Sequence, residues 1–145
     1  MRLFFWFSLC FSAIACNNTS SGPTQKSSEF VDLPKDFLNF YNTFHTDSAY
    51  QIAHIEWPLK GEKAEKQPDG SAKKVLTIWE PETWQMLHMP DLNDPGLKRS
   101  YETMSDVLII EKMQYPMVNY GLERQFFKEE NNEWKLIYYS EMQEL

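Results

Sequence analysis

The sequence predicts a single α+β domain in which N-terminal helices lie on one face of an antiparallel sheet. Phe37, Tyr41 and Phe44 recur at intervals of three and four residues, so they line one face of a helix. After about residue 55, apolar and polar residues alternate over several short segments, as they do in strands that are half-buried in a sheet. Helices first and a long strand meander last is an order typical of α+β domains.

The individual elements follow from local signals. We expect the first helix to begin near Pro34 and to end near His45, because proline is tolerated in a first helical turn. Asp47 or Ser48 should cap a second, short helix. Strands are expected over 55–60, 75–79, 102–113, 118–128 and 133–141, with a proline-led helix over 81–89 and a charged loop over 61–74.

The N-terminus predicts a removable signal peptide over residues 1–15. Its apolar run, 3–15, is too short to cross a bilayer comfortably and follows a single arginine. Ala13-Ile14-Ala15 precedes Cys16, and this junction resembles the lipobox of bacterial lipoproteins. The resemblance implies cleavage before Cys16 and lipid on its sulfur, although alanine in place of leucine at the first lipobox position leaves an ordinary secretory signal open. Cys10 would be removed, so Cys16 would be the only thiol and no internal disulfide could form.

Charge and length limit the partners. Residues 16–28 are predicted to be the lipidated cysteine and a flexible polar tether, and 29–145 to be one domain. Loss of Arg2 with the signal leaves 13 basic and 21 acidic residues, a net charge of −8. This balance, with no basic stripe, argues against nucleic acid and against broad adhesion to anionic lipid. We expect a protein anchored by lipid in the bacterial cell envelope, at the periplasmic or surface face of the outer membrane.

One pattern points to a family. Residues 44–59 read Phe-x-x-Asp-Ser-x-aromatic-Gln-x-x-x-Ile-x-aromatic-Pro-Leu. This pattern resembles a family of domains of unknown function from Bacteroidetes lipoproteins, within the nuclear-transport-factor-2-like superfamily. The resemblance covers roughly residues 30–145 and implies a cone, in which a strongly curved sheet wraps the N-terminal helix, often around a pocket. It implies no reaction, because this fold serves enzymes and binding modules alike.

Arg124 is the most informative candidate for a ligand site. Apolar residues of the last two strands occupy even positions, so Arg124 should share the inward face of Phe126 and Tyr138. This register requires an odd-length loop or a bulge near Glu130-Asn131-Asn132. A guanidinium on an inward face needs a carboxylate or a ligand, and both remain open. The carboxylates considered are Glu80, Glu102 and Glu111.

The tryptophans offer a second possible ligand surface. Trp57, Trp79, Trp84 and Trp134 could form a platform for a carbohydrate or a hydrophobic ligand, but core packing suits most of them. The ligand-binding residues predicted from the sequence are Arg124, Tyr138 and Trp57.

The sequence gives only weak support for other functional motifs. A catalytic triad could be formed by His45, Asp47 and Ser48, but these residues lie at one helix-to-turn junction. Helix capping accounts for Asp47 and Ser48. Asp47-Ser48-Ala49 also resembles an acceptor sequence for O-glycosylation, which stays open. Asp91, Asn93, Gly96 and Glu102 match four positions of a calcium loop, but Pro95 occupies a ligand position. The three histidines lack metal-ligand spacing, so neither a metal nor a cofactor is expected.

Two function classes remain. The first is a non-catalytic envelope lipoprotein that binds a small molecule or another envelope protein. The alternative is an isomerase- or hydratase-type enzyme with a buried acid or base in the cone pocket. Its candidate acids and bases are Asp36, Asp47, His54 and Glu111.

Overall fold

The computed structural model describes residues 33–145. The predictions for residues 1–15 and 16–28, lipidation of Cys16 among them, lie outside the described residues. The elements are α1 (Lys35–Phe44), α2 (Ser48–Ala53), β1 (Ile55–Lys66), β2 (Ala72–Trp79), the 3₁₀ turn η1 (Pro81–Thr83), β3 (Lys98–Ser105), β4 (Leu108–Tyr115), β5 (Tyr120–Lys128) and β6 (Trp134–Glu144).

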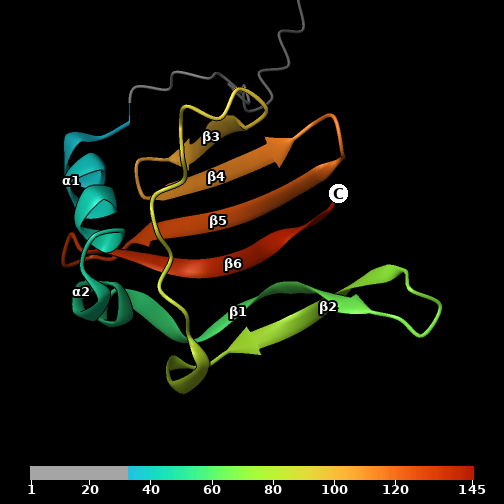
Figure 1. Ribbon diagram of the computed structural model, residues 1–145. Helices are drawn as coiled ribbons and strands as arrows, with labels where there is room; N and C mark the ends of the chain where they lie inside the picture. The colour runs from blue at the N-terminus through green and yellow to red at the C-terminus, as the bar shows by residue number, and fades with distance from the viewer. Residues whose placement is uncertain (1–32) are drawn as a thin grey trace, which may run out of the picture.

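One curved sheet of six strands, in the order β2-β1-β6-β5-β4-β3, forms the body of the domain (Figure 1). All neighbouring strands are antiparallel except β1 and β6, which are parallel, so the expectation of a wholly antiparallel sheet is wrong at this pair. The reason is topological: the last strand inserts between the β1–β2 hairpin and the β3–β5 meander, which fixes its direction. Gly61 is required there, because a side chain at this position would clash with the carbonyl oxygen of Tyr139.

Three predicted elements differ from the structure. Most of 61–74 is strand, with the turn confined to 67–71, because charged side chains are compatible with an exposed hairpin. The helix expected over 81–89 is only the turn η1, and Trp84 is already extended. The strand expected over 102–113 is a hairpin that bends between β3 and β4.

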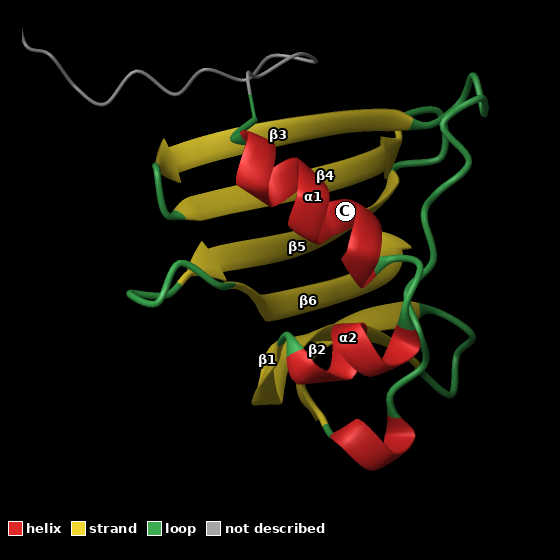
Figure 2. Cartoon of the chain, turned by 90° about the vertical axis from the view of Figure 1, so that its left-hand side faces the viewer, coloured by secondary structure: helices red, strands yellow, loops and turns green. Residues whose placement is uncertain are grey.

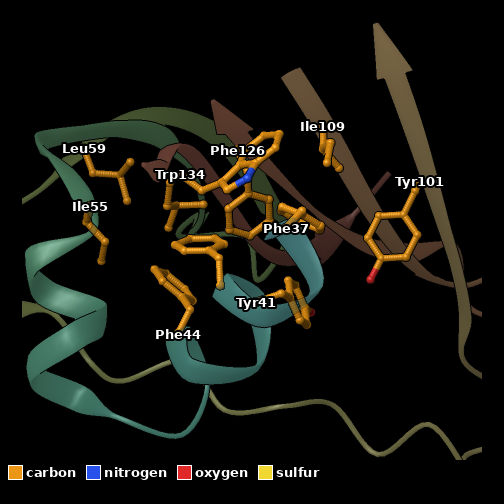
Figure 3. Close-up of a cluster of buried hydrophobic side chains, with 11 residues drawn as sticks. Phe37, Tyr41, Phe44, Ile55, Leu59, Tyr101, Ile109, Phe126 and Trp134 are labelled. Atoms are coloured by element: carbon orange, nitrogen blue, oxygen red, sulfur yellow. The ribbon is translucent and has the colours of Figure 1, made fainter. Parts of the chain in front are cut away.

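The aromatic face of α1 is buried, as predicted. Phe37, Tyr41 and Phe44 are all buried, and the Phe37 ring lies 5.4 Å from that of Phe126 and 5.0 Å from that of Trp134. Figure 2 shows α1 crossing the face of β4 and β5, and Figure 3 shows these rings meeting between the helix and the strands. Edge-on aromatic contacts of this kind contribute beyond their buried area.

The loop between β5 and β6 has an odd number of residues, as predicted. Lys128 pairs with Trp134, and the loop between them includes Asn132 at φ 67°. A register shift farther along then places Arg124 opposite Tyr139. Tyr138 pairs with Gln125 and lies on the other face of the sheet, so the prediction that it shares the face of Arg124 is wrong.

Candidate functional site

A polar cluster is buried between α1 and the inward faces of β3, β4 and β5. Glu111 is fully buried, and its Oε1 accepts hydrogen bonds from Tyr41 Oη at 2.8 Å and from Arg99 Nε at 2.7 Å. Arg124 Nη1 lies 3.4 Å from the other carboxylate oxygen. Of the three carboxylates considered for Arg124, Glu111 is therefore its partner. We call Tyr41, His45, Arg99, Glu111 and Arg124 the buried polar cluster.

His45 is held neutral in this cluster. Its Nδ1 lies 2.8 Å from the carbonyl oxygen of Tyr41, and its Nε2 lies 2.8 Å from Arg124 Nη1. A carbonyl only accepts and a guanidinium only donates, so the proton must sit on Nδ1. Burial, with Arg124 adding repulsion, lowers the pKa of His45 to about 4. Burial therefore outweighs the preference of a helix C-terminus for an imidazolium.

The cluster holds more positive than negative charge. Arg99 lies between two rings, 4.8 Å from the centroid of Tyr41 and 4.7 Å from that of Tyr101. Burial raises the pKa of both phenols, so they remain neutral. Two guanidinium groups thus share the single carboxylate of Glu111, and Arg99 Nη2 and Arg124 Nε have no hydrogen-bond partner among residues 33–145. Arg124 does project inward as predicted, but it is already engaged by the protein.

A cleft of about 320 Å³ lies on the same side of the sheet, next to the 84–97 segment. The rings of Trp84 and Tyr139 meet at 78° with centroids 5.4 Å apart, and Trp79 lies 5.5 Å from Tyr139. Among the described residues that line it, Glu141 is the only charged one. We call this site the aromatic cleft; its lining residues are Trp79, Thr83, Trp84, Gln85, Met86, Leu87, Tyr139 and Glu141.

Trp57 lies behind the aromatic cleft. Its ring contacts that of Trp84 at 5.6 Å, and its Nε1 donates to the carbonyl of Ile52 at 2.9 Å. It therefore supports one wall and does not line the cleft. Trp134 belongs to the core, as expected for most tryptophans.

Gln51 fixes the cleft wall, and sequence reasoning gave it no role. Its Nε2 donates to the carbonyl of Phe44 at 2.6 Å and to that of Leu87 at 2.9 Å. Its Oε1 accepts from Trp84 Nε1 at 3.0 Å and from the Leu87 amide at 2.8 Å. This fully buried amide thus ties α2 to the irregular segment, which also explains why that segment is not a helix. The only sequence signal was the glutamine within the family pattern.

The candidate acids and bases are dispersed. Asp36 pairs with Lys128 at 2.8 Å, and Asp47 caps α2 through the amide of Tyr50. His54 stacks on Tyr50 with centroids 3.7 Å apart and lines, with Asp36, an open groove separate from the aromatic cleft. The triad reading fails because both nitrogens of His45 are engaged by Tyr41 and Arg124.

The calcium pattern is not assembled as a loop. Asp91 accepts from the amide of Asn93, and Asp94 accepts from the Tyr115 hydroxyl at 2.9 Å. Glu102 lies within β3 and pairs with Lys112 at 2.8 Å. Within residues 33–145, no group of three or more His, Cys, Asp or Glu side chains is placed to hold a metal ion. No helix in this part of the chain is long and apolar enough to span a membrane.

Solved structures with the same fold define its class. A cystatin-like protein from Bacteroides caccae matches with a TM-score of 0.55 at 18% identity, over 72% of this chain and 74% of that one. A nuclear-transport-factor-2-like protein from Bacteroides fragilis matches with a TM-score of 0.51 at 17% identity, over 80% of this chain and 50% of that one. A protein from Bacteroides ovatus matches with a TM-score of 0.51 at 16% identity, over 74% of each chain. The fold of this chain is therefore α+β and is similar to the folds of a cystatin-like and a nuclear-transport-factor-2-like protein.

The family follows from the sequence itself. The model of a family described as a domain of unknown function, DUF4348, matches residues 28–141, and the chain belongs to this family. No curated protein matches the chain. The resemblance drawn from the 44–59 pattern is confirmed, and it brings a fold without an assigned activity.

Proposed function

We propose that this protein is a non-catalytic binding module of the bacterial cell envelope, held at the membrane by lipid on Cys16. Its α1 and α2 helices and its curved sheet would together form the cone expected of the family. In this proposal the aromatic cleft binds a neutral saccharide. The observation that supports this proposal is the lining, in which three partly exposed aromatic rings and several polar side chains surround a cleft of about 320 Å³.

The chemistry of the lining favours a sugar. The C–H faces of a sugar ring are apolar and can lie against the rings of Trp79, Trp84 and Tyr139, as amphipathic ligands commonly do. Its hydroxyl groups can donate to Glu141 and exchange hydrogen bonds with Gln85. Because the lining contains a carboxylate and no lysine or arginine, an anionic ligand is disfavoured.

The enzyme alternative has less support. It needs an acid or base that is buried and available to a substrate. Of the four candidates only Glu111 is fully buried, and two arginines and Tyr41 occupy its oxygens. Binding is therefore the function that this geometry supports best.

Neighbouring tyrosines on opposite faces of β6 provide a test. Cellotriose, a neutral trisaccharide, should quench or shift tryptophan fluorescence saturably, and trigalacturonate, its anionic counterpart, should not. Tyr139→Ala should weaken cellotriose binding about tenfold or more, whereas Tyr138→Ala should leave it unchanged. Thermal melts would establish that both variants are folded.

Two results would contradict this function. No saturable binding of cellotriose would remove the saccharide proposal, and equal loss in the two variants would show that the aromatic cleft is not the site.

A further inference from the structure

The parallel pairing of β1 and β6 stops while both strands continue. Their last paired residues are Glu62 and Ser140. Beyond this point β1 pairs only with β2, through to Lys66, and β6 pairs only with β5, through to Glu144. In Figure 1 the β1–β2 hairpin runs away from β6 at this end. We call the gap between residues 63–66 and 141–144 the split seam.

The split seam presents backbone groups without a strand partner. The amide of Ala64 donates to Glu141 Oε1 at 3.2 Å, so a side chain takes the place of a strand carbonyl. Bridging by a glutamate means that the two backbones are farther apart than the ~4.8 Å spacing of paired strands. Unpaired strand edges are templates for another peptide backbone, because only a backbone repeats donors and acceptors at that spacing.

A buried acceptor in the seam is also unsatisfied. Gln143 is only 3% exposed, and its Nε2 donates to Ser140 Oγ at 2.8 Å. Its Oε1 is buried and has no hydrogen-bond partner in the described part of the chain. Leaving such an acceptor unpaired destabilises the fold, and a hydrogen bond from an incoming N–H group would remove this cost.

A groove continues from the seam onto the outer face of the sheet. A small pocket of about 180 Å³ opens between Ala64, Ala72 and Gln143. It shares Gln143 and Lys74 with a larger pocket of about 290 Å³, which Tyr138 also lines. Side chains on one face of an inserted strand would enter this groove. The larger pocket is lined by two lysines, Lys74 and Lys112, and two glutamates, Glu62 and Glu123, so its charges balance.

We propose that the split seam binds an extended segment of a partner polypeptide by β-strand addition. Main-chain hydrogen bonds to β1 and β6 supply most of the affinity, and the Tyr138 groove accepts alternate side chains. Because the groove charges balance, binding changes little with ionic strength. This site shares Glu141 with the aromatic cleft, but it uses the backbones of β1 and β6 and does not depend on saccharide binding.

The test uses a defined peptide on protein carrying Cys16→Ser, so that no lipid is attached. The probe is acetyl-(Thr-Val)₃-amide, and its matched control is the same peptide N-methylated at alternate residues. The plain peptide should saturably shift the amide NMR signals of Ala64, Glu141 and Gln143. The N-methylated peptide should bind at least about tenfold more weakly, because it keeps the side chains but lacks half of the N–H donors.

A protein variant gives a second arm. The Ala64 amide points into the seam and not toward β2, so Ala64→Pro removes a seam donor without breaking a β1–β2 hydrogen bond. It should weaken the peptide about tenfold, whereas Leu76→Ser, on the exposed outer face of β2, should not. If a thermal melt shows that Ala64→Pro does not fold, the comparison of the plain and N-methylated peptides on the wild-type seam still tests the proposal.

Three results would overturn the proposal. Equal binding of both peptides would rule out strand addition, and shifts confined to Trp79, Trp84 and Tyr139 would place the peptide in the aromatic cleft. If the NMR signals of the seam residues shifted with protein concentration in the absence of peptide, a second copy of this chain would be the molecule that binds the seam. Tyr139→Ala should leave peptide binding intact, which separates this site from the proposed saccharide site.

Discussion

At the scale of single residues, His45 makes the stability of the domain sensitive to mild acid. Its pKa is about 4 in the fold against 6.5 ordinarily, so the unfolded chain takes up a proton at a higher pH than the folded one. The stabilisation is therefore complete above about pH 6.5 and is lost as pH falls toward 4. The shift corresponds to a loss on the order of 3 kcal/mol across this window.

Urea denaturation between pH 4 and 7 measures this effect. His45→Gln keeps a donor and an acceptor but cannot titrate, so its free energy of unfolding should fall less steeply over that range. Carboxylates with a lowered pKa, such as Asp94, lose their stabilising effect mainly below pH 5, and both proteins share this contribution, so it cancels in the comparison. Identical slopes for the two proteins would show that His45 is not the titrating group.

Glu111 is the residue on which the charge of the buried polar cluster depends. Glu111→Gln leaves Arg99 and Arg124 without their shared carboxylate and should cost about 3–5 kcal/mol. Glu102→Gln is the matched control, because its pair with Lys112 is partly exposed and should be worth less than about 1 kcal/mol. Chemical denaturation of both variants compares them, and equal losses would contradict a special role for the buried carboxylate.

Arg124→Met separates the two roles considered for this arginine. Glu111 keeps Arg99 at 2.7 Å, so this variant should be less destabilising than Glu111→Gln. It should still lower the melting temperature, because His45 Nε2 loses its donor. A melting temperature at or above that of the wild type would instead mark an arginine that is poised for a ligand.

At the scale of elements, α1 contributes through its buried face. Phe44 is fully buried, and its ring meets that of Phe126 at 90° with centroids 5.9 Å apart. Phe44→Ala should therefore cost about 3–5 kcal/mol in chemical denaturation. Leu38→Ala, on the same helix but 49% exposed, should cost less than about 0.5 kcal/mol. A loss below about 1 kcal/mol for Phe44→Ala would mean that this face is not held in a core.

Local signals in the sequence predicted some of these elements and could not predict others. The spacing of Phe37, Tyr41 and Phe44 and the cap at Asp47 are short-range features, and both were readable. The odd number of residues in the loop that contains Asn132 followed from the apolar residues at even positions in both flanking strands. The assumption that even-numbered residues of both strands share one face fails at the register shift between Gln125 and Phe126. Such a bulge depends on packing across the sheet, so the alternation of apolar and polar residues in the sequence does not reveal it.

The candidate site was harder to predict than the fold because its parts meet only through tertiary contacts. The even-position rule correctly placed Arg124 on the inward face, but it selected Tyr138 where the cleft contains Tyr139. The irregular 84–97 segment forms a wall because Gln51 binds Leu87 across 36 residues. The parallel β1–β6 pair, which creates the split seam, depends on strand insertion that no single segment encodes.

At the scale of the whole molecule, the proposed lipid on Cys16 would be the only strong contact with the membrane. The predicted mature chain has a net charge of −8, so anionic lipid headgroups should repel the domain itself. Removing the acyl site should therefore release the protein completely, and low salt should not restore binding. A peripheral domain with a basic patch would instead be retained at low salt.

Detergent phase partitioning of Cys16→Ser against wild type measures this directly. The wild-type protein should enter the detergent phase and the variant should remain in the aqueous phase at both low and high salt. Ser21→Ala, a change within the predicted tether, should behave as wild type because it leaves the Ala13-Ile14-Ala15-Cys16 junction intact. Aqueous partitioning of both wild type and Cys16→Ser would instead support ordinary secretion. The tether of residues 17–28 would then have no anchor to hold, and the domain would act as a free binding protein in the envelope.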